Sequence, residues 1–471
     1  MSTVAIAHRT HKDEFALVAA PFVDGQGLPF AEVLDVESIE TAFRNQNALF
    51  GQDPDDVFST AVVLWAFLGQ TLRDGKGAAC AAAVSDIATY MLQTGQKVPS
   101  GDTGDYCRAR AKLSLSALQV LVKGSSRRLE ESAASSWLWR GRHAKLVDGF
   151  TFTMPDTPEN QEAFPQNPVQ TPGVGLPIAR ACAVLSLATG SICDLAIGPY
   201  LGKETGESAL LRELLDAFDP GDVAVFDRYF CSYMLVAMLS LRGVHVCVRL
   251  HQRRRVDEAC SRRLGPGDDL VTWCRPDRPA WMSVELYEQI PDTLTLRQVQ
   301  FDVREPGRRT ERLVVVTTLF SPKEHTKADV AELYGFRWNA ELDIRVIKQT
   351  LNLDHLRCKT PPMVRRELWV TLLAYNLIRG VIATAAVVHE KQPRCLGFTM
   401  ACQTVLASWM LWSTGAVRDA DAMRSLMLTN IAANEVADRP GRIEPRVIKR
   451  RRHQYPLMQR PRDVLRAKLA N

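Results

Sequence analysis

The fold is decided by the stretch DVAVFDRYFCSYMLVAMLSLRGVHVCVRL, residues 222–250. Residues 223–226 and 244–250 are short, largely apolar runs, and an apolar segment of helical length, residues 231–241, separates them. Short buried strands on either side of a helix are typical of an α/β sheet. The stretch therefore predicts a strand, a helix and a second strand at the centre of such a sheet.

The residues before this stretch extend the same pattern. HAKLVDGFTFTM at 143–154 predicts a strand, and residues 178–200 predict two strands joined by a Thr-Gly-Ser turn. ESALLRELLDAF at 207–218 predicts an amphipathic helix. Together, residues 143–250 indicate a β-hairpin followed by alternating strands and helices, with strands of mixed direction.

The rest of the chain divides into regions of different character. Residues 251–320 contain Gly/Pro-rich turns and two strand-like runs, at 293–303 and 312–319. The predicted fold class is α/β: a mixed sheet core with a β-rich insertion, plus helical N-terminal and helical, basic C-terminal regions. The expected regions are a helical N-terminal part at 1–135, a core at 136–250 and 323–410, the insertion at 251–322 and the C-terminal part at 411–471.

Charge is concentrated at one end of the chain. The 471 residues include 58 Lys and Arg against 53 Asp and Glu, a formal net charge of only +5. From residue 439 to the C-terminus, however, 11 basic residues face two acids, so this tail carries +9 and the remainder −4. The basic character is therefore a feature of the C-terminus and not of the whole protein.

Bulk features exclude several classes of protein. A content of 46% hydrophobic and 24% charged residues is that of a globular protein and not of a disordered or collagen-like one. The 11 cysteines include no C-x-x-C pair, which favours reduced thiols and a cytoplasmic location, and the N-terminus shows no signal peptide. Asn376 and Arg379 interrupt the apolar run 370–388, which therefore predicts a buried helix and no membrane span.

A basic segment follows the predicted N-terminal helices. SGDTGDYCRARAKLS at 100–114 is a Gly-rich turn that runs into Arg108, Arg110 and Lys112. These cations are as consistent with a DNA-contacting helix as with a solvated helix face. The segment alone does not decide between the two.

Two aspartates stand at the predicted strands. Asp148 lies within the strand at 143–154, and Asp227 directly follows the apolar run 223–226. In open α/β sheets, functional groups gather at the carboxyl ends of the strands. Each aspartate alone is as consistent with a loop cap as with a metal ligand.

A predicted helix over YGFRWNAELDIRVIKQTL, residues 334–351, carries a polar stripe. At 100° per residue, five side chains share an arc of about 80°: Tyr334, Arg337, Glu341, Arg345 and Lys348. A solvated, ion-paired face would also give such a stripe, but the flanking apolar residues leave little of the helix to face water. The pattern therefore favours a cleft lined by the stripe.

Three carboxylates accompanied by cations suit metal-dependent phosphoryl transfer. Mg²⁺ prefers oxygen ligands, so carboxylates on different elements serve it better than His or Cys. Two such ions activate the attacking oxygen and stabilise the departing one at a phosphodiester. Lys and Arg at the same site bind the flanking phosphates.

The stripe resembles the Tyr-Arg-Glu-Lys signature of the bacterial insertion-sequence-four family of DDE transposases, with the spacing Tyr334-x2-Arg337-x3-Glu341-x6-Lys348. Three further blocks are similar to that family's first-Asp block, second-Asp block and terminus: VDGFTFTMPDTPENQEAFPQ at 147–166, VFDRYFCSY at 225–233 and RIEPRVIKRRRHQYPL at 442–457. Phe150 departs from the small hydroxylic residue expected after Asp-Gly, which concerns local packing and leaves the metal ligands in place.

The resemblance implies a transposase with a ribonuclease-H-like core that acts on the terminal inverted repeats of its element. Asp148, Asp227 and Glu341 would hold two Mg²⁺ ions, with Mn²⁺ as an alternative ion. Water would first nick one strand, and the freed 3′-OH would form a hairpin that is later opened and joined to target DNA. The DNA contacts near the cut would come from Tyr334, Arg337, Arg345 and Lys348.

The same resemblance implies further contacts with DNA. The basic tail is expected to bind DNA, with a solubilising role as the alternative, through Arg446, Lys449, Arg450 and Arg451. Trp273 or Trp281 in the insertion would stack on a flipped base, although each is more often a core aromatic. Bringing two ends together implies a homodimer on DNA, and no membrane is involved.

Two other functions stay open from the sequence. A ribonuclease-H-like nuclease that cuts DNA without strand transfer needs only the three carboxylates, whereas the stripe and the basic tail favour transfer. A DNA-binding relative that has lost catalysis is disfavoured because all three carboxylates are present.

Overall fold

The structure, a computed structural model, describes residues 14–22, 33, 35–53, 55–251, 261–303, 311–436 and 458–469. The chain divides into two compact units, each assembled from separate segments. The helical unit comprises Met1–His143, Leu185–Asp194 and Glu341–Val436, and the sheet unit comprises Ala144–Val184, Leu195–Ala340 and Ala437–Asn471. The expected α/β class with a large mixed sheet is confirmed, while the finer division into five consecutive regions stays a prediction.

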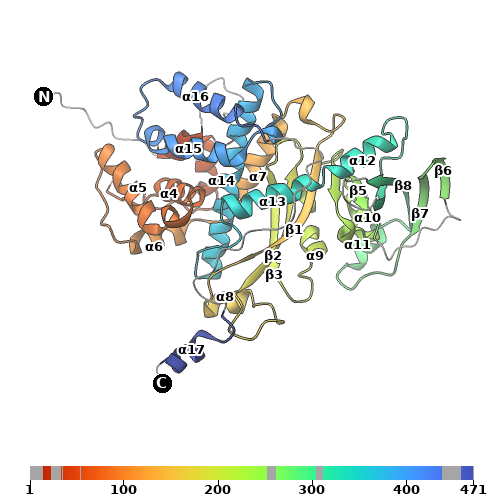
Figure 1. Ribbon diagram of the computed structural model, residues 1–471, viewed down its shortest axis with the longest axis horizontal. Coiled ribbons are helices and arrows are strands. Elements are labelled where there is room, and N and C mark those ends of the chain that lie inside the picture. Colours follow the sequence, from red (N-terminus) through yellow and green to blue (C-terminus); the bar gives the residue numbers. More distant parts are fainter. Residues whose placement is uncertain are drawn as a thin grey trace. The chain divides into compact units, whose positions relative to one another are not determined.

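The sheet unit is built on nine strands in the order β3-β2-β1-β4-β5-β9-β8-β7-β6 (Figure 1). The strands are β1 (Ala144–Thr153), β2 (Ile178–Ser186), β3 (Ile192–Pro199), β4 (Val223–Phe226), β5 (His245–Arg249), β6 (Ser261–Gly265), β7 (Asp268–Cys274), β8 (Thr293–Val303) and β9 (Glu311–Thr317). The helices are α8 (Pro158–Ala163), α9 (Glu207–Arg212), η5 (Leu215–Ala217), η6 (Arg228–Phe230), α10 (Tyr233–Leu241), α11 (Val284–Gln289), α12 (Lys327–Gly335) and α17 (Arg462–Leu469).

The predicted strand–helix–strand stretch forms the centre of this sheet. β1, β4 and β5 run parallel, with Ala144 opposite Val223 and Val223 opposite His245. The four residues of β4 are fully buried, as expected for a short parallel strand covered on both faces. Parallel neighbours end at the same edge of a sheet, so the residues that follow these strands are brought together.

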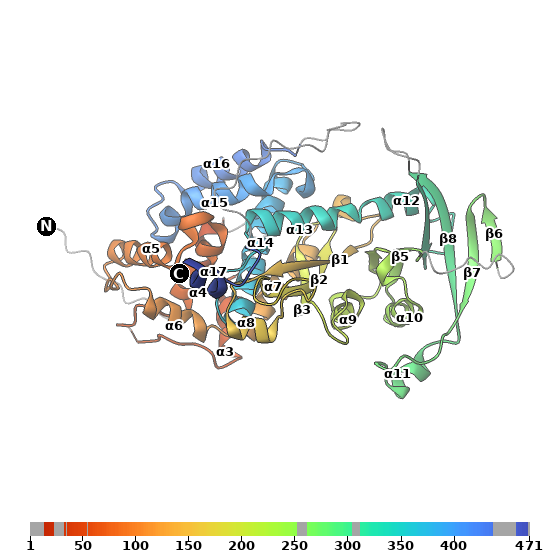
Figure 2. The same ribbon diagram turned by 60° about the horizontal axis from the view of Figure 1, so that its bottom comes forward.

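The β-rich insertion continues the same sheet. β9 pairs antiparallel with β5, and β8, β7 and β6 follow as antiparallel neighbours. Figure 2 shows β8, β7 and β6 side by side in this order. Arg297 on β8 is fully buried and donates to both carboxylate oxygens of Asp268 on β7, at 2.8 and 2.6 Å. A buried arginine is tolerated because its charge and hydrogen-bonding groups are satisfied by this bidentate pair.

The helical unit is arranged around α14 (Pro361–Val388), which packs against α4, α7, α15 and α16. Its other elements are α2 (Ala16–Ala19), η1 (Ala20–Phe22), α3 (Val36–Arg44), α4 (Thr60–Leu72), η3 (Gly75–Ala78), α5 (Cys80–Gln93), α6 (Gly104–Lys112), α7 (Leu115–Glu131), η4 (Ser135–Trp137), η8 (Pro393–Cys395), α15 (Phe398–Ser413) and α16 (Ala420–Ala432). α13 (Trp338–Thr350) crosses the boundary between the two units.

By length and composition alone α14 could cross a membrane, but 94% of its most apolar window is buried inside the protein. The buried helix expected at 370–388 is therefore what the structure contains. Its central Arg379 is 4% exposed and donates to Asp343 on α13 at 2.6 Å and to the Tyr375 hydroxyl at 2.9 Å. The charge of Arg379 is thus paired with a carboxylate and a hydroxyl group, which explains how it is accommodated in the middle of an apolar helix.

The same ion pair reaches the turn between β2 and β3. Asp343 also accepts from Arg394 at 2.9 Å, and Arg394 donates to the carbonyl of Ser186 at 2.7 Å. Gly190 in that turn has φ +75°, and a Cβ there would lie 2.9 Å from the Arg379 guanidinium. Glycine is therefore required both for the backbone conformation and for the close approach of the arginine.

Two details of the sequence predictions are wrong. Residues 334–351 do not form one helix: α12 ends at Gly335, and α13 begins at Trp338 after a turn in which the Arg337 N–H donates to the Tyr334 carbonyl at 3.1 Å. Trp338 is 51% exposed, so the flanking apolar residues do not all leave the solvent.

The basic segment at 100–114 also differs from a single charged face. Arg108 is exposed and pairs with Asp105, whereas Arg110 on the same helix is buried. Residues two apart on a helix point in nearly opposite directions, which separates these two cations.

The described cysteines are all free thiols, in agreement with the expectation of reduced cysteines.

Candidate active site

The candidate site lies where β4 and β5 end, beside the middle of the parallel neighbour β1. The register pairs Leu146 with Val225 and Phe226 with Val248. Continued past the strand ends, this register sets Asp148 beside Asp227 and Asp227 beside Arg249. Two carboxylates and a cation therefore lie on neighbouring strands at the level where β4 and β5 end, and open α/β sheets carry their functional groups at the carboxyl ends of strands.

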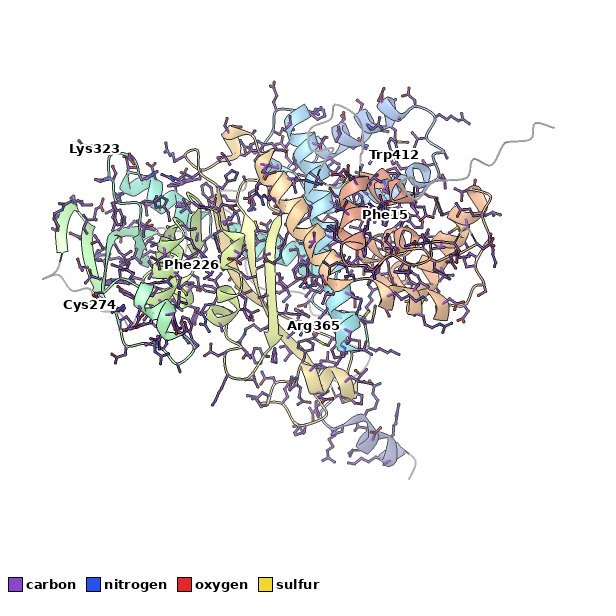
Figure 3. All side chains as sticks on the ribbon, turned by 180° about the vertical axis from the view of Figure 1, so that it is seen from behind. Phe15, Phe226, Cys274, Lys323, Arg365 and Trp412 are labelled. Carbon is purple, nitrogen blue, oxygen red and sulfur yellow. The ribbon has the colours of Figure 1, made fainter. Side chains whose placement is uncertain are left out.

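The backbone around both aspartates is held by apolar packing. Phe226, labelled in Figure 3, is fully buried and directly precedes Asp227. Asp227 also accepts from the N–H of Tyr229 at 2.8 Å, so it caps the short helix η6. Phe150 is buried, and its ring centroid lies 6.4 Å from that of Phe152, so the unexpected residue after Asp-Gly fills the core and leaves Asp148 on the strand.

Arg337 and Tyr334 join the two aspartates. The guanidinium of Arg337 approaches the Asp148 carboxylate at 3.9 Å, and both side chains are mostly buried. Burial raises the pKa of Tyr334 to about 12, an increase that Asp227 reinforces and that Arg337 and Arg249 oppose. Tyr334 is therefore protonated at neutral pH and can donate a hydrogen bond to an anion, but it cannot act as a base.

A further acid, Glu207 at the start of α9, lies against the strand that carries Asp148. A Cβ added to Gly149 would meet the Glu207 carboxyl carbon at 2.2 Å, so the carboxyl group lies directly over the Gly149 backbone. Burial raises the pKa of Glu207, and Asp227 raises it further, while Arg180 opposes the increase. Arg180 is itself positioned by a hydrogen bond to the Thr205 carbonyl at 3.2 Å.

The remaining predicted residues belong to the helical unit or fall outside the described residues. Glu341 is half-buried on α13, Arg345 on the same helix is exposed, and Lys348 pairs with Asp354 at 2.7 Å. All three belong to the helical unit, so their meeting with Asp148 and Asp227 stays a prediction. The tail residues lie outside the described residues: Arg446, Lys449, Arg450 and Arg451.

The donor chemistry of the strand ends fits a hard divalent cation. Asp148 and Asp227 offer carboxylate oxygens, which Mg²⁺ prefers, and no Cys or His stands between them in the register. Within the described part of the chain, no group of three or more His, Cys, Asp or Glu side chains is gathered closely enough to hold an ion.

Sequence reasoning missed Arg249, Glu207 and Arg180. Arg249 could have been found from the sequence, because it is the last residue of an apolar strand, just as Asp227 directly follows an apolar strand. Glu207 had none, because its approach to Gly149 depends on how α9 packs in three dimensions. Of the two insertion tryptophans, Trp273 is buried, while the Trp281 ring is covered by the Arg212 guanidinium at 3.9 Å.

Comparisons with known proteins show the family to which this chain is related. A family described as "Transposase DDE domain" matches residues 139–377. The transposase InsG for insertion sequence element IS4 of Escherichia coli is 27% identical over 357 residues, covering 73% of this chain and 77% of that protein. The putative transposase InsL for insertion sequence element IS186A of Escherichia coli is 35% identical over 69 residues, covering 15% of this chain and 19% of that protein.

One solved structure is similar to this chain: the cryo-EM structure of the piggyBac transposase synaptic complex with hairpin DNA. The aligned residues cover 93% of this chain and 80% of the piggyBac chain. Its sequence identity is 10% and its TM-score 0.38, and a TM-score below 0.5 does not establish a shared fold.

Proposed function

This chain belongs to the family of transposases with a DDE domain, of the IS4 type, and from that premise we propose that it cuts and joins DNA at the terminal inverted repeats of an insertion sequence. The proposed reaction is strand cleavage followed by strand transfer, through a hairpin intermediate, on a ribonuclease-H-like core. We further propose that it acts as a homodimer on DNA in the cytoplasm. The observation that carries the proposal is the register that sets Asp148 beside Asp227, with Arg337 at 3.9 Å from Asp148.

The proposed ligands of two Mg²⁺ ions, for which Mn²⁺ can substitute, are Asp148, Asp227 and Glu341. When bound, the ions supply an activated oxygen nucleophile and stabilise the departing oxygen of the phosphodiester. Arg337, with Arg249 beside Asp227, binds the non-bridging oxygens of the phosphates that flank the cut. Tyr334, kept protonated, donates a hydrogen bond to a phosphate oxygen. Arg345 and Lys348 are proposed to extend these contacts along the DNA backbone.

Strand transfer separates this function from that of a nuclease. We expect that duplexes ending in the inverted repeats that flank the coding region, incubated with target plasmid, protein and Mg²⁺, give covalently joined product. Gel electrophoresis of labelled ends measures nicked, hairpin and joined DNA in one reaction. Nicked ends without joined product would favour the nuclease, and binding without any cleavage would favour a relative that has lost catalysis.

A substitution at Gly149 tests whether Glu207 positions the Asp148 strand. In Gly149→Ala the new methyl group would displace the flexible Glu207 carboxyl, and we expect cleavage to fall by about 10²-fold because catalytic groups tolerate little misplacement. Single-turnover cleavage rates measure the effect, and thermal unfolding checks that the fold survives.

The matched control for Gly149→Ala is Gly198→Ala in the same sheet, where a Cβ would meet only Leu210 at 3.5 Å, and it should cleave normally. If the effect runs through Glu207, Gly149→Ala should cost little more in a Glu207→Ala background, since coupled sites are not additive. Full additivity of the two substitutions would exclude a role for the contact.

A further inference from the structure

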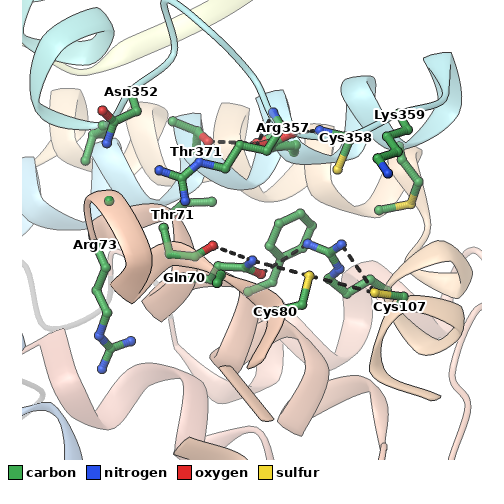
Figure 4. A pocket seen from close by; sticks show the side chains of 18 of the residues that line it. Gln70, Thr71, Arg73, Cys80, Cys107, Asn352, Arg357, Cys358, Lys359 and Thr371 are labelled. Atoms are coloured by element: carbon green, nitrogen blue, oxygen red, sulfur yellow. Dashed lines mark hydrogen bonds between the residues drawn. The ribbon is translucent and has the colours of Figure 1, made fainter. Parts of the chain in front are cut away.

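The helical unit contains an open cavity of about 710 Å³ that shares no residue with the candidate active site. It lies between the N-terminal helices α4 and α6 and the loop that joins α13 to α14. In Figure 4, Gln70, Cys80 and Cys107 lie along one side, and Arg357 and Lys359 lie on the opposite side. Segments separated by more than two hundred residues thus meet at this cavity.

The lining of the cavity is strongly basic. Five cations line it, Arg73, Lys76, Arg110, Arg357 and Lys359, against the single acid Glu367. Glu367 is buried and accepts from the backbone N–H groups of Arg357 and Cys358, at 2.8 to 3.0 Å, so it holds the loop in place. Arg73 pairs with Asp86 at 2.9 Å. Within the described residues, neither Lys76 nor Arg357 forms an ion pair, so the cavity keeps a surplus of positive charge.

Arg110 shows that this charge is built into the protein and is not only a surface feature. It is 8% exposed, and its guanidinium lies over the rings of Phe67 and Tyr106 at 4.7 and 5.1 Å. Its only oxygen acceptor is Gln70, at 3.1 Å, and its Nε has no hydrogen-bond partner among the described residues. A buried cation without a carboxylate is costly, and an anion in the cavity would offset that cost.

We propose that this cavity binds a phosphate group, supplied by the backbone of the bound DNA. A phosphate presents the tetrahedral anionic oxygens that arginines bind through paired N–H groups. The cations that would bind it are Arg357 on the loop, Arg110 on α6 and Lys76 on η3, which all line the cavity. The source of the phosphate rests on the proposed function, whereas the anion site itself rests on the cavity alone.

Salt-dependent binding tests the DNA contact with a matched control. We expect Arg357→Gln to weaken binding of a 30-base-pair duplex by about tenfold and to lower the slope of log K against log salt by about 1, because one phosphate contact is lost. Arg418→Gln removes an exposed arginine of the same unit that lies outside the cavity, and it should change neither quantity. Equal affinities and slopes for wild type and Arg357→Gln would overturn the DNA contact.

The cavity thiols provide a second measurement that needs no substitution. Cys80 and Cys107 are half-buried in the lining, with their sulfur atoms 3.7 Å apart, while Cys395 is exposed in the same unit outside it. We expect duplex DNA to slow alkylation of Cys80 and Cys107 by N-ethylmaleimide at least threefold, and to leave Cys395 unchanged, as read by mass spectrometry.

Inorganic phosphate forms the second arm of the alkylation experiment. Protection by millimolar phosphate but not by DNA would keep the anion site and overturn its assignment to the DNA backbone. Protection by neither would overturn the site itself. If DNA protects Cys80 and Cys107 from alkylation but the protein does not cleave the element's ends, the result would count against the proposed function and not against this cavity.

Discussion

Replacing Asp148 or Asp227 by alanine is expected to abolish Mg²⁺-dependent cleavage of the element's ends while leaving their binding intact. Asp148 lies within β1 and Asp227 directly follows the parallel neighbour β4, and their proposed task is to hold the ions that stabilise charge during phosphoryl transfer. Such stabilisation is worth several kcal/mol, so we expect the cleavage rate to fall by about 10³-fold or more. Glu341→Ala is expected to have the same effect, because Glu341 is the third proposed ligand of the ions.

Cleavage of labelled ends in Mg²⁺ measures the rate, and a gel-shift assay measures binding of the same DNA. Asp216→Ala is the control, since Asp216 is an exposed acid of the sheet unit that pairs only at the surface with Arg242. This variant should cut and bind normally. Normal nicking by any of the three active-site variants would contradict the assignment of the catalytic carboxylates.

The strands were predictable because their signals are local. A four-residue apolar run such as β4, and the alternating run that became β8 at Thr293–Val303, carry their burial pattern in the sequence itself. The break between α12 and α13 was harder to predict, because the polar stripe continues across it with helical spacing. Gly335 was its one local signal, since glycine is common where a helix ends.

The candidate site was predictable only where strand topology decides it. Asp227 and Arg249 follow from the rule that parallel strands end at one edge, whereas Asp148 lies within β1 and is set beside Asp227 by the register. Glu207 depends on the packing of α9 against Gly149, which leaves no pattern in the sequence. The surroundings of Arg110 depend on a loop more than two hundred residues away, although helical spacing alone separates it from Arg108.

Asp343→Ala is expected to destabilise the helical unit by about 3–5 kcal/mol, the usual cost of leaving a buried charge without its partner. Asp343 is 3% exposed and accepts from both Arg379 and Arg394. Removing it would leave Arg379, a buried residue of α14, without a carboxylate partner. Among the described residues, Arg379 has no second carboxylate within hydrogen-bond distance. Urea unfolding followed by circular dichroism measures the loss.

A surface ion pair on the same unit provides the control for Asp343→Ala. Asp354, a few residues further along, is exposed and pairs with Lys348, so Asp354→Ala should cost less than about 1 kcal/mol. Asp343→Asn keeps an oxygen acceptor for Arg379 and should fall between the two. A loss below about 1 kcal/mol for Asp343→Ala would mean that Arg379 reaches water or another partner. Because Asp343 lies two residues after Glu341, the same ion pair would also hold in place the helix that carries the third carboxylate.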